Sequence, residues 1–176
     1  MTYAPLVVQD YDPRWPRMYA DTKAEILRAT GGTIAAIEHI GSTAIPGLAA
    51  KPLIDILVAL RRFPEDIEAT IAPLAGIGFD YVPKPRPDRY FFRKGVWGQG
   101  TQHLHIVEFG GEDWTQQLLF RDYLTTHPEL AKQYAALKRQ LATRFGTDRR
   151  SYTEEKTAFI VSALAAARRQ QPASRG

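Results

Sequence analysis

The stretch EHIGSTAIPGLAAKPLIDILV, residues 38–58, decides the fold of this chain. Residues 33–37 before it are mostly apolar or β-branched and show no polar helical face, which predicts a strand. Glycines, prolines and small residues then predict a loop, which ends at Lys51 because a residue before proline avoids helical space. Residues 53–60 form a second apolar run, interrupted only by Asp55, as is typical of a strand buried on both faces. The pattern predicts a strand, a loop and a second strand.

Asp55 is the residue of this stretch that most needs an explanation. A carboxylate in the middle of an apolar strand costs free energy unless a charged group or a metal ion meets it. We therefore take Asp55 as a candidate catalytic residue, acting either as a metal ligand or as a base.

The loop before Asp55 has the composition of an anion-binding turn. Gly41, Ser42 and Thr43 offer closely spaced backbone N–H groups and two hydroxyls with little side-chain bulk. Lys51 adds a point charge suited to a phosphate. The spacing is not that of a Walker A loop, since no lysine directly follows the second glycine. An ordinary tight turn is the alternative for the glycines alone, and the nearby Asp55 favours a binding site.

Two further strands are predicted to carry polar side chains on one face. In residues 89–93, alternation places Arg89 and Arg93 on the same side. In residues 102–109, it places His103 and His105 on one side, about 7 Å apart at roughly 3.3 Å per residue.

We expect these imidazoles to lie on the Asp55 face of the sheet, where they could chelate a metal ion together with Asp55. Histidine is the commonest protein metal ligand. The predicted metal ligands are Asp55 and His105, with His39 and His103 as further candidates. A pair of hydrogen-bonded histidines in a polar cleft is the alternative, and the pattern alone does not choose between them.

The C-terminal part is predicted to be helical, and each helix carries one cation on its apolar stripe. These cations are Arg121, Lys138 and Lys156. A single such residue is most simply explained by a packed stem with its charged head in water. Three in succession favour a shared anion, or an internal ion pair with a carboxylate such as Asp55, Glu108 or Asp122. The predicted helices span residues 112–126, 128–145 and 152–169.

The remaining elements are short. Residues 6–8 are predicted to form a strand, a helix is expected to run from Pro13 or Pro16 to about residue 29, and residues 65–75 form another helix. Residues 79–82 are predicted as a strand. The segments 83–88, with three prolines, and 95–100, with Trp97, are expected to be connections.

Length and composition are those of one ordinary globular domain. The 176 residues are 44% hydrophobic and 24% charged, and we expect one domain over residues 1–169 with a disordered tail at 170–176. The absence of cysteine excludes disulfides, thiolate zinc sites and a cysteine nucleophile. No apolar run is long enough to cross a membrane and residues 1–20 lack a signal peptide's apolar core, so we expect a cytoplasmic protein without membrane contact. The net charge of +4 suits an anionic ligand, but the scattered aromatic residues and the lack of a dense basic stripe disfavour nucleic acid.

The chain resembles the GrpB family. The matching motifs are HIGSTAIPGL at residues 39–48, Lys51-Pro52, IDI at 54–56, HLHIV at 103–107 and LFRDYL at 119–124, and the resemblance extends to about residue 164. It implies a fold similar to that of the nucleotidyltransferase superfamily, in which a Gly-Ser pair precedes a strand that bears metal-binding carboxylates.

One departure from that pattern affects the expected cofactor. A second carboxylate would be expected two residues beyond the first, where this chain has Leu57. Two-metal phosphoryl transfer needs bridging carboxylates, and Mg²⁺ prefers oxygen ligands to histidine. A single Mg²⁺ held partly by substrate phosphates, a softer ion such as Mn²⁺ or Zn²⁺, and a metal-free pocket are the cofactor alternatives.

Together these observations predict an α/β (α+β) domain with a mixed, largely antiparallel nucleotidyltransferase-like sheet and a C-terminal helical bundle. The expected function is to bind a nucleotide or another phosphorylated metabolite, with transfer of a nucleotidyl group as the expected chemistry. The predicted catalytic residues are Asp55, His103 and His105. The predicted phosphate-binding residues are Gly41, Ser42, Thr43, Lys51, Arg89, Arg93, Arg121, Lys138 and Lys156.

Two alternative functions come from other classes. One is a metal-dependent hydrolase built on Asp55 and the histidines His39, His103 and His105. The other is a non-catalytic module that binds a nucleotide or a coenzyme A-like ligand. The resemblance supports the second alternative, because GrpB domains are joined to dephospho-CoA kinase in some proteins, and so does the missing carboxylate at Leu57.

Overall fold

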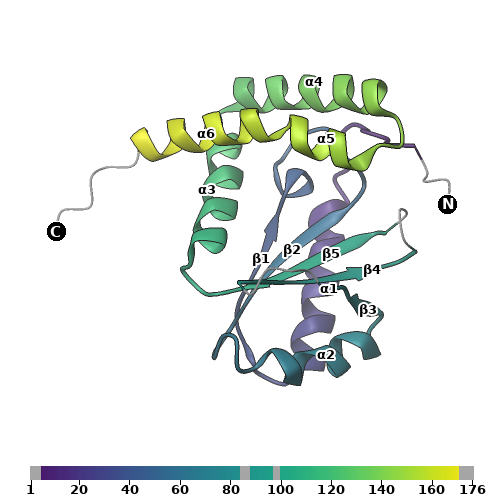
Figure 1. The fold of residues 1–176 in the computed structure, drawn as a ribbon, viewed down its shortest axis with the longest axis vertical. Coiled ribbons are helices and arrows are strands. Elements are labelled where there is room, and N and C mark those ends of the chain that lie inside the picture. Colours follow the sequence, from purple (N-terminus) through teal and green to yellow (C-terminus); the bar gives the residue numbers. More distant parts are fainter. Residues whose placement is uncertain (1–4, 84–87, 97–99, 171–176) are drawn as a thin grey trace.

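Five strands form one mixed sheet in the order β1-β2-β5-β4-β3 (Figure 1). The computed structural model describes residues 5–83, 88–96 and 100–170. Strands β2 and β5 are parallel, while the β1/β2, β4/β5 and β3/β4 pairs are antiparallel, which confirms the predicted largely antiparallel sheet. The strands are β1 (Ile34–Ile40), β2 (Ile54–Leu60), β3 (Phe79–Tyr81), β4 (Arg89–Lys94) and β5 (Gln102–Val107).

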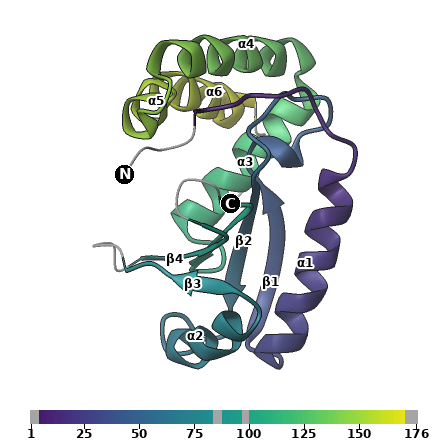
Figure 2. The same ribbon diagram turned by 90° about the vertical axis from the view of Figure 1, so that its right-hand side faces the viewer.

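Helices cover the sheet on both faces and across one end (Figures 1 and 2). Helices α1 (Trp15–Thr30) and α2 (Ile67–Gly76) pack on one face, where their apolar residues join those of β2 and β5 in the largest core cluster. Helix α3 (Glu112–Thr126) packs on the other face through Trp114. Helices α4 (Pro128–Phe145), α5 (Arg149–Glu155) and α6 (Thr157–Gln170) form a layer at one end.

The loop between β1 and β2 packs beneath this helical layer. A short 3-10 turn, η1 (Ser42–Ala44), begins the loop. Ile45 and Leu48 then enter a core cluster with Tyr134 of α4 and Leu124 of α3. Burial of these apolar side chains holds the loop against the C-terminal helices, at roughly 25 cal/mol per Å² of apolar surface removed from water.

The strand register sorts polar and apolar side chains onto opposite faces. Asp55 of β2 pairs with His103 of β5. Since side chains alternate along a strand, His105 shares their face, whereas Leu104 and Ile106 enter the core beneath α1. The predicted placement of both histidines on the Asp55 face is therefore confirmed.

Most predicted elements are present, with shifted ends. Helices α3 and α4 have the predicted bounds. Strand β1 continues to Ile40, three residues beyond the predicted 33–37, because residues 38–40 still pair with β2. The strand predicted at residues 6–8 is wrong: these residues form no strand, and an isolated bridge between Gln9 and Ala50 follows them.

The last predicted helix is two helices in the structure. It starts earlier than expected, because Asp148 caps the N-terminus of α5 by accepting hydrogen bonds from the backbone of Arg150 and Ser151. Helices α5 and α6 meet at Lys156, and α6 includes Gln170, where the tail was expected to begin. Trp97, most of the proline-rich 83–88 connection and the rest of the tail lie outside the described residues. Within the described ranges, no helix combines the length and apolarity needed to cross a membrane.

Candidate functional site

Gly41 brings the loop into close contact with Asp55. Gly41 has φ of +72°, and a Cβ at this position would lie only 2.5 Å from Asp55 Oδ2. Any larger residue would therefore be strained in its backbone and would collide with the carboxylate. The glycine is needed here so that the loop can lie directly over Asp55.

Thr43 and His39 hold the loop through hydrogen bonds inside the protein and do not line the Asp55 face. The Thr43 hydroxyl is buried, donates to the Leu53 carbonyl at 3.1 Å and lies 3.0 Å from His39 Nε2. The His39 ring stacks on Tyr19 of α1, on the opposite face of the sheet from Asp55. Burial lowers the pKa of His39 to about 4, against the opposing effect of the Asp55 charge, so the ring is neutral near pH 7. The structure thus does not bring Thr43 to a phosphate position or His39 to the metal candidates.

Asp55, His103 and His105 form a close polar cluster. Each offers one potential ligand atom, and the three atoms lie within 4.8 Å of one another, which within the described ranges no other group of three such residues achieves. His103 Nδ1 lies 3.4 Å from Asp55 Oδ1. Burial raises the pKa of Asp55, but the hydrogen bond from His103 and the nearby positive charges, including Lys51, outweigh it, so the pKa is lowered overall.

The spacing of this cluster suits a metal ion, but its hydrogen bonding does not. Arg89 Nε donates to His105 Nδ1 at 3.2 Å, and Arg89 also pairs with Asp113 of α3. One carboxylate and two imidazoles, one of them bonded to a guanidinium, are a poor donor set for Mg²⁺.

The two arginines of β4 are held by acidic partners. Arg89 is bound between His105 and Asp113, and Arg93 lies 3.7 Å from Asp80 of β3. Both share the predicted face, since Arg93 is paired with His103 across the strands. Their guanidinium groups are engaged within the protein, which differs from their predicted role as phosphate ligands.

Lys138 of α4 reaches into the loop. Its side chain is 2% exposed, and its ammonium donates to Ser42 Oγ at 2.8 Å and to the Ala49 carbonyl at 2.5 Å. Burial, together with the charges of Lys156 and Lys51, lowers the pKa of Lys138 to about 7. Burial is the larger cause, and the two neighbouring positive charges add to it.

Lys51 and Lys156 complete a lysine cluster with Lys138. Both of their ammonium groups lie over the ring of Tyr152, at 5.0 Å for Lys51 and 4.6 Å for Lys156. Burial is the main cause that lowers the pKa of Lys156 to about 8, and it also lowers the pKa of Lys51. The charge of Asp55 acts on the pKa of both lysines in the opposite direction.

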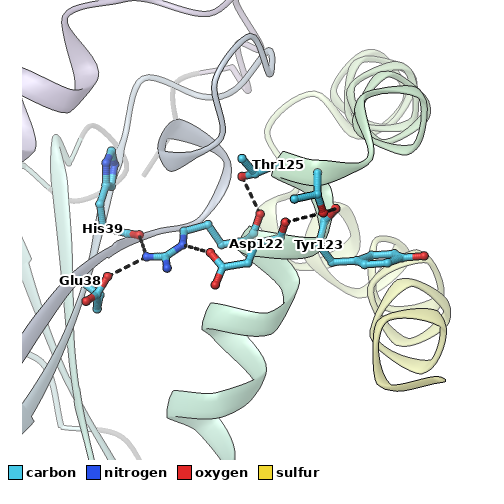
Figure 3. A network of polar contacts seen from close by, with 7 residues as sticks. Glu38, His39, Asp122, Tyr123 and Thr125 are labelled. Atoms are coloured by element: carbon cyan, nitrogen blue, oxygen red, sulfur yellow. Dashed lines mark hydrogen bonds and ion pairs between the residues drawn. The ribbon is translucent and has the colours of Figure 1, made fainter. Parts of the chain in front are cut away.

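Arg121 does not join this cluster. Its guanidinium donates to Glu38 at 2.8 Å, to Asp122 at 2.7 Å and to the His39 carbonyl at 3.0 Å (Figure 3). The predicted alternative of an internal ion pair with Asp122 is therefore the correct one for Arg121. It fastens α3 to the edge strand β1, beside a hollow of about 400 Å³ that Tyr19 also lines.

The contacts of the lysine cluster with the rings of Tyr134 and Tyr152 were not predicted from the sequence. Lys138 lies 4.7 Å from the Tyr134 ring, and Lys156 is in the same relation to Tyr152. Both are Tyr-x-x-x-Lys pairs, whose members face each other on a helix, so the spacing contained the signal.

Curated relatives of this chain include proteins with and without an activity in their names. This chain is 41% identical over 157 residues to a UPF0157 protein of Pseudomonas aeruginosa, and the match covers 87% of this chain and 64% of that protein. It is 36% identical over 168 residues to YqkA of Bacillus subtilis, covering 90% of this chain and 46% of that one. It is 28% identical over 180 residues to a dephospho-CoA kinase of Mycolicibacterium paratuberculosis, covering 87% of this chain and 44% of that one. The chain thus spans less than two thirds of each of these relatives.

Solved structures show the same fold. The crystal structure of the conserved protein GrpB from Enterococcus faecalis has a TM-score of 0.84 at 32% identity, covering 92% of this chain and 96% of that one. The Cid1 poly(U) polymerase, in a structure with bound MgGTP, has a TM-score of 0.52 at 17% identity, covering 77% of this chain and 44% of that one. The latter likeness concerns the fold alone and is of the nucleotidyltransferase type. The sequence model of the GrpB protein family matches residues 5–166 of this chain. Given this match over nearly the whole chain, the protein belongs to the GrpB family.

Proposed function

We propose that this chain binds the phosphate groups of a nucleotide, or of another phosphorylated metabolite, between the 41–51 loop and helices α4–α6. The observation that carries the proposal is a cluster of three lysines: Lys138 donates to the Ser42 hydroxyl, and Lys51 and Lys156 lie over the ring of Tyr152. The charge of Asp55 acts on Lys51 and Lys156. A hydroxyl and three ammonium groups are donors of the kind that phosphate oxygens accept.

The charge balance of the site supports an anionic ligand. Burial and mutual repulsion destabilise the protonated lysines, as the lowered pKa values of Lys138 and Lys156 show. Asp55 is the carboxylate that acts on Lys51 and Lys156, and it cannot neutralise both of them and Lys138. A bound phosphate would relieve the repulsion and restore the protons, because an opposite charge nearby favours the charged form of an amine.

Within this proposal, the proximity of Asp55, His103 and His105 supports nucleotidyl transfer as the reaction. Asp55 stays ionised near neutral pH and can accept a hydrogen bond from an attacking hydroxyl. His103 and His105 lie next to it and can donate to charge that develops on the phosphate.

A coenzyme-binding module without catalysis is the second candidate. Leu57 is fully buried at the position where a second metal-binding carboxylate was expected. In addition, one relative of this chain is named dephospho-CoA kinase. Both observations suit a site that binds a phosphorylated coenzyme and performs no transfer.

The deciding experiment titrates the four ribonucleoside triphosphates, coenzyme A and dephospho-CoA into the protein by calorimetry, with the unphosphorylated nucleosides as controls. Turnover of the tightest triphosphate is then followed with a labelled α-phosphate and added Mg²⁺ or Mn²⁺. We expect binding of phosphorylated compounds only. Tight binding without product over hours would favour the coenzyme module, and nucleoside binding equal to that of the triphosphates would exclude the lysine cluster as the site.

A further inference from the structure

The side chain of Arg89 defines which nitrogen of His105 carries a proton. Arg89 Nε lies 3.2 Å from His105 Nδ1. A guanidinium is protonated at every accessible pH and has donors but no acceptor, so Nδ1 must be the acceptor in this contact. An imidazole whose Nδ1 accepts a hydrogen bond is neutral and carries its proton on Nε2.

The surroundings hold this contact in place. Arg89 also lies 3.5 Å from Asp113, which is in the first turn of α3. The Arg89 side chain is 20% exposed. The ring of Phe91 stacks against His105, with centroids 5.0 Å apart. The imidazole is thereby fixed between an aromatic ring and a guanidinium that is itself paired.

Such an arrangement opposes metal binding by His105. A metal-bound histidine uses one ring nitrogen as the ligand and normally donates its other N–H to a carboxylate or a carbonyl. If a metal bound Nε2, Nδ1 would carry the hydrogen and would face the N–H of Arg89. If a metal bound Nδ1, Arg89 would have to leave.

We propose that Arg89 is a positioning residue that holds His105 in the Nε2–H tautomer, so that His105 donates a hydrogen bond to an anionic ligand and does not ligate a metal ion. The ligand's identity rests on the proposed function, whereas the tautomer and the lack of metal ligation do not. His103 differs, because its Nδ1 faces the carboxylate of Asp55.

The tautomer is directly measurable. Long-range ¹H–¹⁵N spectra of the ¹⁵N-histidine-labelled protein at pH 7.5 separate protonated from unprotonated ring nitrogens, and the His105→Gln spectrum assigns the His105 signals. We expect an unprotonated Nδ1 and a protonated Nε2. A proton on Nδ1, alone or on both nitrogens, would overturn the proposal, and this measurement needs no variant of Arg89.

Metal titration gives a second, independent readout. On addition of Zn²⁺ or Mn²⁺ without a phosphate ligand, the His105 signals of the parent should not shift or broaden, and Arg89→Met should bind Zn²⁺ about tenfold more tightly or better. Arg93→Met is the matched control, because Arg93 lies on the same face of β4 and contacts Asp80. The control should keep the His105 tautomer and the metal affinity of the parent. The proposal would be contradicted if a metal ion bound through His105 in the parent. It would also be contradicted if Arg93→Met raised the metal affinity as much as Arg89→Met does. Failure of nucleotide binding would leave these results unchanged.

Discussion

Lys138 Nζ lies 2.8 Å from Ser42 Oγ, so a buried lysine of α4 is bonded directly to the loop that follows β1. The same ammonium donates to the Ala49 carbonyl near the other end of that loop. The C-terminal helical layer and the strand–loop–strand unit therefore build the lysine cluster together. Neither part would hold the cluster alone.

The protonation of Lys138 makes the stability of the ligand-free protein depend on pH. Its pKa falls from the ordinary 10.5 to about 7 in the folded protein, so the unfolded chain holds more protons between these values. The free energy of unfolding therefore rises with pH from 7 towards 10, by roughly 2 kcal/mol between pH 7 and pH 9 from this group.

Lys138→Met should remove that part of the pH dependence. Urea unfolding of the parent and of the variant at pH 7 and pH 9 measures the difference. The parent should gain stability relative to Lys138→Met as the pH rises. Equal pH slopes would mean that Lys138 keeps an ordinary pKa in the folded protein.

Gly41→Ala should destabilise the protein more than Gly47→Ala. Both glycines have positive φ, +72° and +75°, so either alanine is strained in its backbone, and at Gly41, with ψ of −170°, the strain is about 1–3 kcal/mol because this region is essentially restricted to glycine. Only a Cβ at position 41 meets Asp55, whereas nothing lies within 4 Å of one at position 47. The collision should add about 1–3 kcal/mol, measured by chemical denaturation. Equal losses for the two variants would show that the loop does not press on Asp55.

Arg121→Met should weaken the fold and leave ligand binding intact. The change leaves Glu38 and the His39 carbonyl without their donor, which should cost about 1–3 kcal/mol. Arg17→Met is the control, because Arg17 forms an exposed ion pair with Asp21 and should lose less than about 1 kcal/mol. If Arg121→Met abolished triphosphate binding while keeping its stability, Arg121 would belong to the binding site after all.

The sequence predicted the fold well because hydrophobic alternation and turn residues act locally. The apolar run around Asp55 and the alternation of His103 and His105 were sufficient to place all three on one face. The end of β1 was misjudged because residues 38–40 owe their strand conformation to pairing with β2, which no local pattern reports.

The site was predicted only in part, because the direction of a long side chain depends on its tertiary partners. Lys51 and Lys156 lie over the same tyrosine ring and act on Lys138 through their charges, whereas Arg121, from an equivalent stripe, is bound by Glu38 and Asp122. Periodicity locates the stem of a cation on a helix. The acceptors that surround it in the fold decide where its charged head lies: Glu38 and Asp122 for Arg121, and the Ser42 hydroxyl and the Ala49 carbonyl for Lys138.

The most direct test of the lysine cluster uses inorganic tripolyphosphate, which contains the phosphates of a nucleotide but no base or sugar. Calorimetry at pH 6.5 compares the parent with Lys138→Met and Lys156→Met, and Lys132→Met serves as a control because Lys132 is exposed on α4. We predict that the parent and the control bind tripolyphosphate equally, and that each cluster variant binds it about tenfold more weakly or worse, since a hydrogen bond to a charged group contributes about 1.5–3 kcal/mol. If the parent bound neither tripolyphosphate nor any nucleoside triphosphate, or if the cluster variants bound them as well as the control, the lysine cluster would not be a phosphate site.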